Sequence, residues 1–135
     1  MSEHDEQAAL FGWALLQADV YPPLRLLHAI PNGGHRHKAV AAKMHAEGVK
    51  RGVPDICLPV ARGDYHGLYI EMKFGRSRPS DEQLGWLEAL AGQGYKTAVC
   101  WSFEAAQRVI LEYLNLKPSE RPYAQIVSAQ AASIS

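Results

Sequence analysis

Residues 54–74, PDICLPVARGDYHGLYIEMKF, decide the fold of this chain. They contain two apolar runs, 54–60 and 67–74, which are separated by the polar segment 61–66. Two apolar runs joined by a short polar connection that contains glycine are typical of a β-hairpin. We therefore expect a pair of antiparallel strands here, and the rest of the fold extends outward from this pair.

The segment that follows the hairpin predicts a helix and then another strand. Ser80 and Gln83 have the spacing of a capping box, which predicts a helix from residue 81 to about residue 90. Residues 95–101 have an apolar strand pattern, and Ser102 is expected to cap a last helix. Because a strand–helix–strand unit predicts a parallel pair with a right-handed crossover, the sheet should be mixed.

The segment that precedes the hairpin predicts two helices and a strand. Ser2 begins the first helix, which Pro22 and Pro23 stop. The apolar residues that recur along it at helical spacing are Leu10, Trp13, Leu16 and Val20. Residues 24–30 are a strand candidate, and residues 38–47 are a helix that Gly48 closes. The order α-β-α-β-β-α-β-α predicts an α/β fold in which helices flank a mixed sheet.

The length and composition of the chain fit one domain. With 135 residues the chain can bury a core without disulfides, and we assign residues 1–116 to this domain. Residues 117–135 lose periodicity, which predicts either a disordered tail or an arm that packs on a partner subunit. The N-terminus is acidic, no apolar run approaches the length of a membrane span, and both cysteines lie in strand patterns. These features predict a cytoplasmic protein with reduced cysteines and no membrane partner.

The net charge of the chain is zero, but the charges are unevenly distributed. Residues 33–51 contain five Lys or Arg, three His and a single acid, Glu47. Arg76 and Arg78 form a second basic spot, whereas acids cluster at residues 3–6 and 81–88. The basic segment is either ordinary solvated surface or a face that contacts phosphate groups beside an acidic metal site.

The hairpin carries three charged side chains that could form a site. Glu71 and Lys73 lie two residues apart in the second strand, so they share a face of the sheet. Asp55 joins them if the hairpin register places it opposite either one, whereas a slip of one residue would turn it away. Two carboxylates can hold a hard divalent cation, and an adjacent ammonium can orient or activate water. The alternative is a Glu71–Lys73 ion pair on a half-exposed strand.

Two further residues have both a structural and a functional interpretation. Glu6 is early in the first helix, where the helix dipole favours a glutamate and from where a third carboxylate could reach the metal ion. Gln83 is the third residue of its helix, so it serves either the capping box alone or the site as well.

These motifs together resemble a known family. The segments Asn32-Gly33-Gly34, Gly52-Val53-Pro54-Asp55, Glu71-Met72-Lys73 and Ser80-Asp81-Glu82-Gln83 are similar to those of the VRR-NUC (virus-type replication-repair nuclease) family, within the PD-(D/E)xK nuclease superfamily. The resemblance covers roughly residues 6–114. It implies the restriction-endonuclease-like core of that superfamily and hydrolysis of DNA that depends on Mg²⁺ or Mn²⁺, in a stand-alone, phage-type member.

The resemblance also implies a role for each residue of the site. The implied metal ligands are the carboxylates of Asp55 and Glu71, the backbone carbonyl of Met72 and, directly or through water, Glu6. Lys73 would orient or deprotonate the attacking water and offset charge on the phosphorane. Gln83 would steady Lys73 or that water.

A DNA partner follows from the same resemblance. We expect basic and polar side chains to contact the DNA backbone without reading its sequence. The predicted contacts are Asn32, His35, Arg36, His37, Lys38, Lys43, Lys50, Arg51, Arg76 and Arg78. Small members of the family resemble homodimers, which fits a branched or Holliday-junction DNA that needs two paired cuts. The alternatives are a nuclease for flap, nicked or duplex DNA, and a junction-binding module without catalysis.

Overall fold

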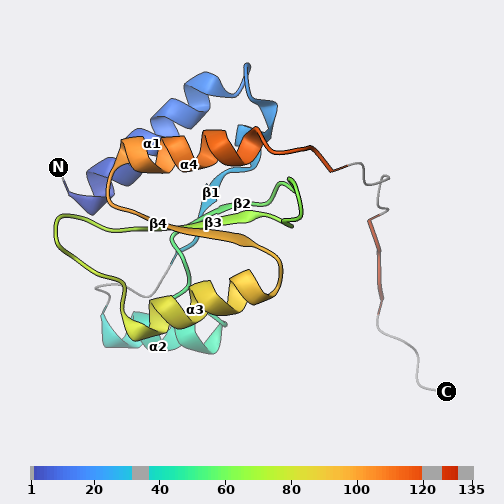
Figure 1. Cartoon of the computed structure of the whole chain (residues 1–135). Coiled ribbons are helices and arrows are strands. Elements are labelled where there is room, and N and C mark those ends of the chain that lie inside the picture. Colours follow the sequence, from blue (N-terminus) through green and yellow to red (C-terminus); the bar gives the residue numbers. More distant parts are fainter. Residues whose placement is uncertain (1, 32–36, 120–125, 131–135) are drawn as a thin grey trace.

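The sheet at the centre of the molecule has four strands and is mixed, as the strand–helix–strand segment predicts (Figure 1). The computed structural model describes residues 2–31, 37–119 and 126–130. The strands are β1 (His28–Ala29), β2 (Ile56–Leu58), β3 (Leu68–Met72) and β4 (Lys96–Cys100). The helices are α1 (Glu3–Gln17), the 3₁₀ helix η1 (Pro22–Leu26), α2 (Lys38–Ala46), α3 (Asp81–Gly92) and α4 (Phe103–Leu114).

The predicted hairpin is present and determines the order of the sheet. β2 pairs with β3 antiparallel, and Ile56 lies opposite Ile70. β1 extends the sheet beyond β2, and β4 runs parallel to β3, so the spatial order is β1-β2-β3-β4. One step further along the β2–β3 register places Asp55 opposite Glu71. The register that the predicted site requires is therefore the observed one.

Helices cover both faces of the sheet, but not equally (Figure 1). α1 and α4 pack on one face and against each other, α3 packs on the other face, and α2 lies on the same side of the sheet as α3. The first face carries most of the core, which includes Leu10 from α1, Leu68, Ile70 and Met72 from β3, and Ile110 from α4. α3 buries only Leu87, and α2 buries no residue at all.

Three helices begin at the caps that the sequence predicts. Ser2 and Asp5 form a reciprocal capping box at α1, and Ser80 and Gln83 form another at α3. The Ser102 hydroxyl accepts a hydrogen bond from the N–H of Ala105 at the start of α4. These contacts join residues three apart, so they depend on local sequence and little on the rest of the fold.

Two local predictions need correction. The predicted strand over residues 24–30 begins inside the 3₁₀ helix η1, which continues to Leu26, and only His28–Ala29 pair with β2. Pro22 and Pro23 occupy its first positions, where their fixed φ suits a helical turn and their missing N–H is not needed.

The second correction concerns the apolar face of α1. Leu10 and Ala14 are buried, whereas Leu16 and Val20 are 79% and 67% exposed. Leu16 is six residues from Leu10, which at about 100° per residue turns it well away from the buried face. The helix also ends at Gln17, before Val20.

The remaining predictions about cysteines and membranes can be compared with the described residues. Cys57 and Cys100 are both free and buried, which confirms that they are core thiols. None of the helices in the described ranges is long and apolar enough to cross a membrane. Within the predicted tail, residues 126–130 have no helix or strand and are exposed.

Candidate functional site

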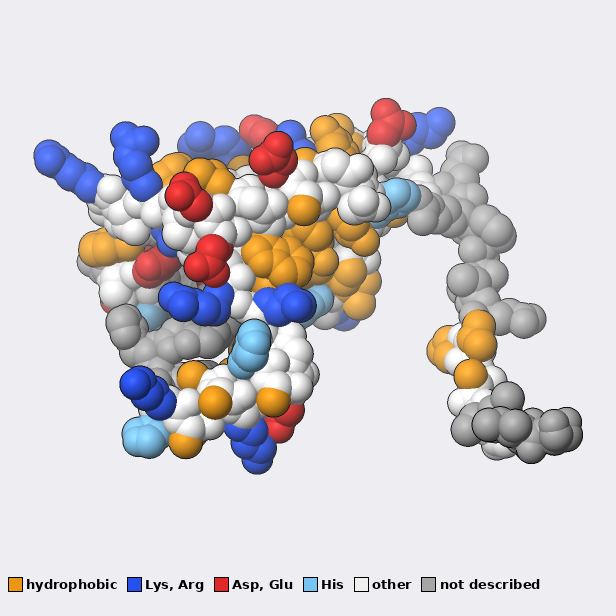
Figure 2. Space-filling model, turned by 90° about the horizontal axis from the view of Figure 1, so that it is seen from below, with side chains coloured by type: hydrophobic (Ala, Val, Ile, Leu, Met, Phe, Trp, Pro, Cys, Tyr) orange, Lys and Arg blue, Asp and Glu red, His pale blue; other side chains and the backbone are white. Residues whose placement is uncertain are grey.

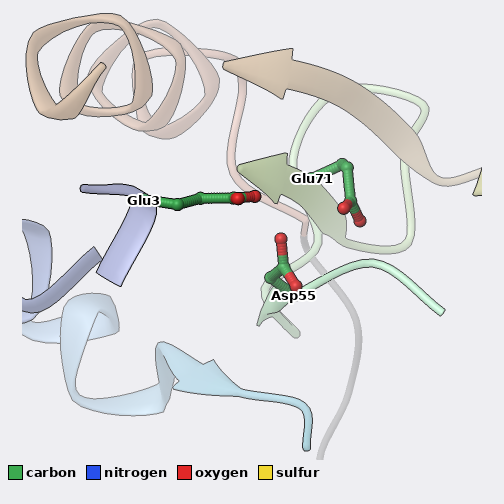
Figure 3. Close-up of side chains that lie close together, drawn as sticks. All are labelled: Glu3, Asp55 and Glu71. Carbon is green, nitrogen blue, oxygen red and sulfur yellow. The ribbon is translucent and has the colours of Figure 1, made fainter. Parts of the chain in front are cut away.

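Three carboxylates from different elements meet at one end of the sheet (Figure 3). Glu3 comes from the first turn of α1, Asp55 directly precedes β2, and Glu71 lies in β3. One oxygen from each lies within 4.8 Å of the others. Figure 3 shows the side chain of Glu3 directed towards the other two. Oxygen ligands at this spacing are suited to a hard divalent cation.

The backbone of the hairpin fixes Asp55 beside β3. Its Oδ2 accepts a hydrogen bond of 2.8 Å from the N–H of Met72. Its carbonyl accepts a second one, 2.7 Å long, from the N–H of Ile30. Pro54, immediately before it, is fully buried. The carboxylate is therefore held at the end of β3 by the strands on both sides of it.

Glu71 is buried although it carries a charge. Its neighbours Ile70 and Met72 face the core under α1 and α4, so the strand alternation turns Glu71 towards the other face. Only 1% of Glu71 is exposed, and Lys73, on the same face, is 8% exposed. The half-exposed ion pair that was the alternative interpretation is therefore not what the hairpin forms. Burying such charges is costly unless they are paired or hold an ion.

The two oxygens of Glu71 have different surroundings. Oε1 accepts a hydrogen bond of 2.9 Å from Nε2 of Gln83, and Nζ of Lys73 lies 3.5 Å away. Oε2 is buried and has no hydrogen-bond partner among the described residues. A buried carboxylate oxygen without a donor, next to two further carboxylates, fits a position that a cation would satisfy.

The pKa values of the three carboxylates are also consistent with a cation site. Burial, and then the neighbouring Asp55, raises the pKa of Glu71 to about 8, although Lys73 opposes the shift. Burial also raises the pKa of Asp55, against the lowering effect of the Met72 N–H and of Lys73. The pKa of Glu3 is raised by burial as well. Carboxylates this close ionise together more easily when positive charge compensates them, which Lys73 supplies in part and a bound cation would complete.

Gln83 connects the site to α3. Its Oε1 accepts the N–H of Ser80 at 2.8 Å, which completes the capping box, and its Nε2 donates to Glu71. The side chain of Gln83 therefore completes the cap and also contacts a carboxylate of the site. The contact is with Glu71 rather than with Lys73, the partner that the family resemblance implies.

Glu6 does not lie where the sequence analysis expects it. Its Oε2 accepts a hydrogen bond of 2.5 Å from the N–H of Phe103, the first residue of α4. The carboxylate that the structure groups with Asp55 and Glu71 is Glu3, so Glu3 replaces Glu6 as the candidate third carboxylate. The sequence places three acids in this turn, and only the rotation of α1 relative to the sheet distinguishes them.

A cleft of about 400 Å³ opens beside the three carboxylates. It is lined by Glu3, His4, Gln7, Ala8, Phe11 and Asp55. His4 and Gln7 are not among the residues predicted from the sequence. Gln7 follows Glu3 by four residues and so shares its side of α1, which is the signal that could have identified it.

The predicted DNA contacts are spread over the surface near α2 and after β3. Lys38, Lys43, Lys50, Arg51, Arg76 and Arg78 are all exposed. His37 is exposed too, and its Nδ1 caps α2 by accepting the N–H of Ala39 at 3.3 Å. Asn32, His35 and Arg36 lie outside the described residues. The face that bears α2 and α3 carries basic and acidic side chains side by side, so its charge is mixed (Figure 2).

Comparison with known proteins identifies the family. The sequence model of the VRR-NUC domain matches residues 5–104. A solved structure of a VRR_NUC domain protein is 31% identical and superposes with a TM-score of 0.74, covering 87% of this chain and 92% of its own. No curated protein matches the chain. A VRR-NUC domain implies a nuclease with DNA as its substrate, and the mixed sheet with its four α-helices is consistent with that fold. The chain therefore belongs to the VRR-NUC family.

Proposed function

We propose that this protein is a DNA endonuclease that depends on Mg²⁺ or Mn²⁺ and hydrolyses phosphodiester bonds. The observation that carries the proposal is the group of Glu3, Asp55 and Glu71, whose oxygens lie within 4.8 Å of one another. The Lys73 ammonium lies 3.5 Å from Glu71. Carboxylates and an ammonium in this arrangement are the groups that metal-assisted phosphodiester hydrolysis needs.

The residues fit a hard divalent cation. Glu3, Asp55 and Glu71 would hold it, and the buried Oε2 of Glu71 supplies an oxygen that has no other described partner. The backbone carbonyl of Met72 is a further proposed ligand. An all-oxygen donor set favours Mg²⁺ or Mn²⁺ over metals that prefer nitrogen or sulfur. When bound, such an ion polarises the scissile phosphate and makes water a better nucleophile.

Lys73 is the proposed catalytic base or water-orienting group. It is 8% exposed and is held beside Glu71, so its ammonium is directed into the site instead of into bulk solvent. As the ammonium, Lys73 would orient the attacking water and offset the negative charge that develops on the phosphorane, and as the neutral amine it would deprotonate that water. Gln83 would fix the orientation of Glu71 through its 2.9 Å hydrogen bond.

The exposed cations would position the DNA. These cations lie before and after the hairpin in the chain, so they flank the segments that lead into and out of the site. On or just after α2 they are Lys38, Lys43, Lys50 and Arg51, and after β3 they are Arg76 and Arg78. Contacts of this kind bind phosphate groups and carry no sequence information.

A homodimer that cuts branched or Holliday-junction DNA is the finer form of the proposal. Its support is the family resemblance together with exposed apolar surface on α1, on η1 and on the turn between them. Leu15, Leu16, Val20 and Leu26 on this surface are 80%, 79%, 67% and 52% exposed. Large exposed apolar side chains close together in the sequence fit a surface that another chain covers.

One experiment tests the activity and the substrate together. The purified chain is incubated with Mg²⁺ or Mn²⁺ and with four-way junction, flap, nicked, splayed and linear duplex DNA. We expect cleavage that EDTA abolishes and that is greatest on the junction. Absence of metal-dependent cleavage on every substrate contradicts the enzyme, and binding of the junction without cleavage supports a binding module. Equal cutting of linear duplex contradicts the preference for junctions, and a monomeric mass in solution contradicts the dimer.

A further inference from the structure

The first turn of α1 carries three acids, and each has a different partner. Asp5 caps its own helix, since its Oδ2 accepts the N–H of Ser2 at 2.9 Å. Glu3 is directed towards Asp55 and Glu71. Glu6 is one turn after Glu3 and reaches α4, where it accepts the N–H of Phe103.

The contact between Glu6 and Phe103 joins segments that are 97 residues apart. Phe103 is the first residue of α4, and its N–H has no carbonyl partner within that helix. Ser102, the N-cap residue, uses its hydroxyl for Ala105 and leaves the Phe103 N–H to Glu6. A carboxylate at a helix N-terminus is also favoured by the helix dipole. Glu6 therefore anchors α1 to the start of α4 through a charge-assisted hydrogen bond.

A second contact between α1 and α4 limits how α1 can move relative to α4. The ring of Trp13, two turns after Glu6, meets the ring of Phe103 edge-on with centroids 6.4 Å apart. Contacts at residues 6 and 13 restrict both the rotation of α1 and its movement along its axis. Glu3, by comparison, makes no side-chain hydrogen bond to any described residue. Its position depends on the turn to which it belongs.

We infer that Glu6 is a positioning residue that places Glu3 in the metal site. Groups that bind a metal must be held within about 0.5 Å of their working geometry, and residues around the ligands supply that restraint. Without the acceptor at residue 6, the first turn of α1 is released from α4 and Glu3 moves relative to Asp55 and Glu71. The inference rests on the proposed function, because it takes Glu3 to be a metal ligand.

The test compares two substitutions of similar size. In Glu6→Gln the amide oxygen still accepts the Phe103 N–H, whereas Glu6→Met keeps the length of the side chain and offers only a weak sulfur acceptor. Glu112→Ala, at an exposed position on α4, removes the same charge away from the site. Circular dichroism and thermal melting establish that each variant is folded, and Glu6→Ala replaces Glu6→Met if that variant is not.

The measurement is Mn²⁺ binding by calorimetry without DNA. We expect Glu6→Met to weaken Mn²⁺ binding by about 10-fold or more, as loss of a residue that supports a ligand does. Glu112→Ala should bind within about 2-fold of the unaltered chain, and Glu6→Gln should lose much less affinity than Glu6→Met because it keeps the acceptor. The pair Glu3→Ala, Glu6→Met should bind no more weakly than Glu3→Ala alone, because Glu6 acts through Glu3.

Different outcomes overturn different claims. Equal losses in Glu6→Gln and Glu6→Met, with the Phe103 amide still protected from hydrogen exchange in Glu6→Gln, would mean that the charge of Glu6 matters in itself, as for a direct ligand, and would overturn the positioning role. Unchanged Mn²⁺ binding in Glu6→Met would also overturn the positioning role. The same holds if the losses of Glu3→Ala and Glu6→Met multiply in the double variant. An unprotected Phe103 amide in hydrogen exchange of the unaltered chain overturns the anchor without any variant. If the unaltered chain binds no Mn²⁺, the metal site itself is wrong, and the inference fails with it.

Discussion

The β2–β3 hairpin and α2 are close in the chain but hold their charged side chains in opposite ways. In the hairpin, Glu71 and Lys73 are 1% and 8% exposed, and hydrogen bonds from the backbone and from Gln83 fix the carboxylates. In α2, no residue is buried, and Lys38 and Lys43 extend from the surface. The hairpin buries its charged side chains, which is energetically costly. α2 leaves its charged side chains in solvent.

The difference suggests that the hairpin carries the chemistry and that the region of α2 binds the DNA. Chemistry at a phosphate needs groups whose distances are fixed, which the sheet provides. Holding a long, charged polymer needs many weak contacts that adapt to it, which exposed cations provide. Substitutions in the hairpin should therefore change the rate of cleavage or the stability of the fold, and substitutions around α2 should change affinity alone.

The largest effect is expected from Lys73→Ala. Loss of the Lys73 amino group removes the group that orients water as the ammonium or deprotonates it as the neutral amine, so the cleavage rate at saturating DNA and Mg²⁺ should fall about 10³-fold. The control is Lys96→Ala, a lysine at the opposite end of the sheet, where its ammonium lies 5.6 Å from the centre of the Tyr65 ring. Similar rates for the two variants would show that Lys73 has no role in the reaction.

The next effect concerns pH and Glu71→Gln. Because the pKa of Glu71 is raised from 4.5 to about 8, the folded chain keeps a proton on Glu71 between these two pH values, whereas the unfolded chain releases it. This stabilises the fold below about pH 4.5, and the contribution is lost as the pH rises to 8. In EDTA, the free energy of unfolding should fall by up to about 5 kcal/mol across this range, which urea titrations measure.

Glu71→Gln separates this effect from other titrations. The variant has no proton to lose, so its stability should depend much less on pH and should exceed that of the unaltered chain at pH 8. Adding Mn²⁺ at pH 8 should stabilise the unaltered chain more than the variant. A variant with the same pH dependence as the unaltered chain contradicts the assignment.

A smaller effect is expected where the chain returns from α2 to the hairpin. Gly52 has a φ of +86°, and a Cβ there would lie 3.0 Å from the backbone of Glu82. Gly52→Ala should therefore destabilise the fold by about 1–3 kcal/mol. Gly85→Ala is the matched control, since a Cβ there meets nothing and alanine favours the helix by about 0.5–1 kcal/mol. Thermal melting of both should show shifts of opposite sign.

The smallest effect is expected from Lys43→Ala combined with Lys50→Ala. Removing two phosphate contacts should weaken DNA binding several-fold and reduce the slope of log affinity against log salt by about 2. Because both side chains are exposed, the free energy of unfolding should change by less than about 0.5 kcal/mol. Fluorescence anisotropy at several salt concentrations measures the slope, and an unchanged slope would remove these lysines from the interface.

Local features of this molecule could be predicted from sequence because their causes are local. The caps at Ser2, Ser80 and Ser102 each involve a residue three positions away. The shared face of Glu71 and Lys73 follows from strand alternation alone. The position of Asp55 also depends on the register of the hairpin, which could not be predicted from the sequence and is known from the structure.

The choice among Glu3, Asp5 and Glu6 could not be predicted in this way. All three are acids in the first turn of α1, and the local sequence favours each of them there. Their separate roles depend on how α1 lies against α4, through a contact that spans 97 residues. The strand predicted over residues 24–30 failed for a related reason, because apolar content alone does not distinguish η1 from a strand.

The two hydrogen bonds of Gln83 restrict which residue can occupy that position. A helix cap accepts either glutamine or glutamate at its third residue, so the start of α3 alone would tolerate both. Nε2 of Gln83, however, donates to Glu71, and a glutamate there would place another negative charge against a buried carboxylate. We therefore expect relatives that keep the acidic site to have glutamine here, and those with glutamate to have lost or rearranged it.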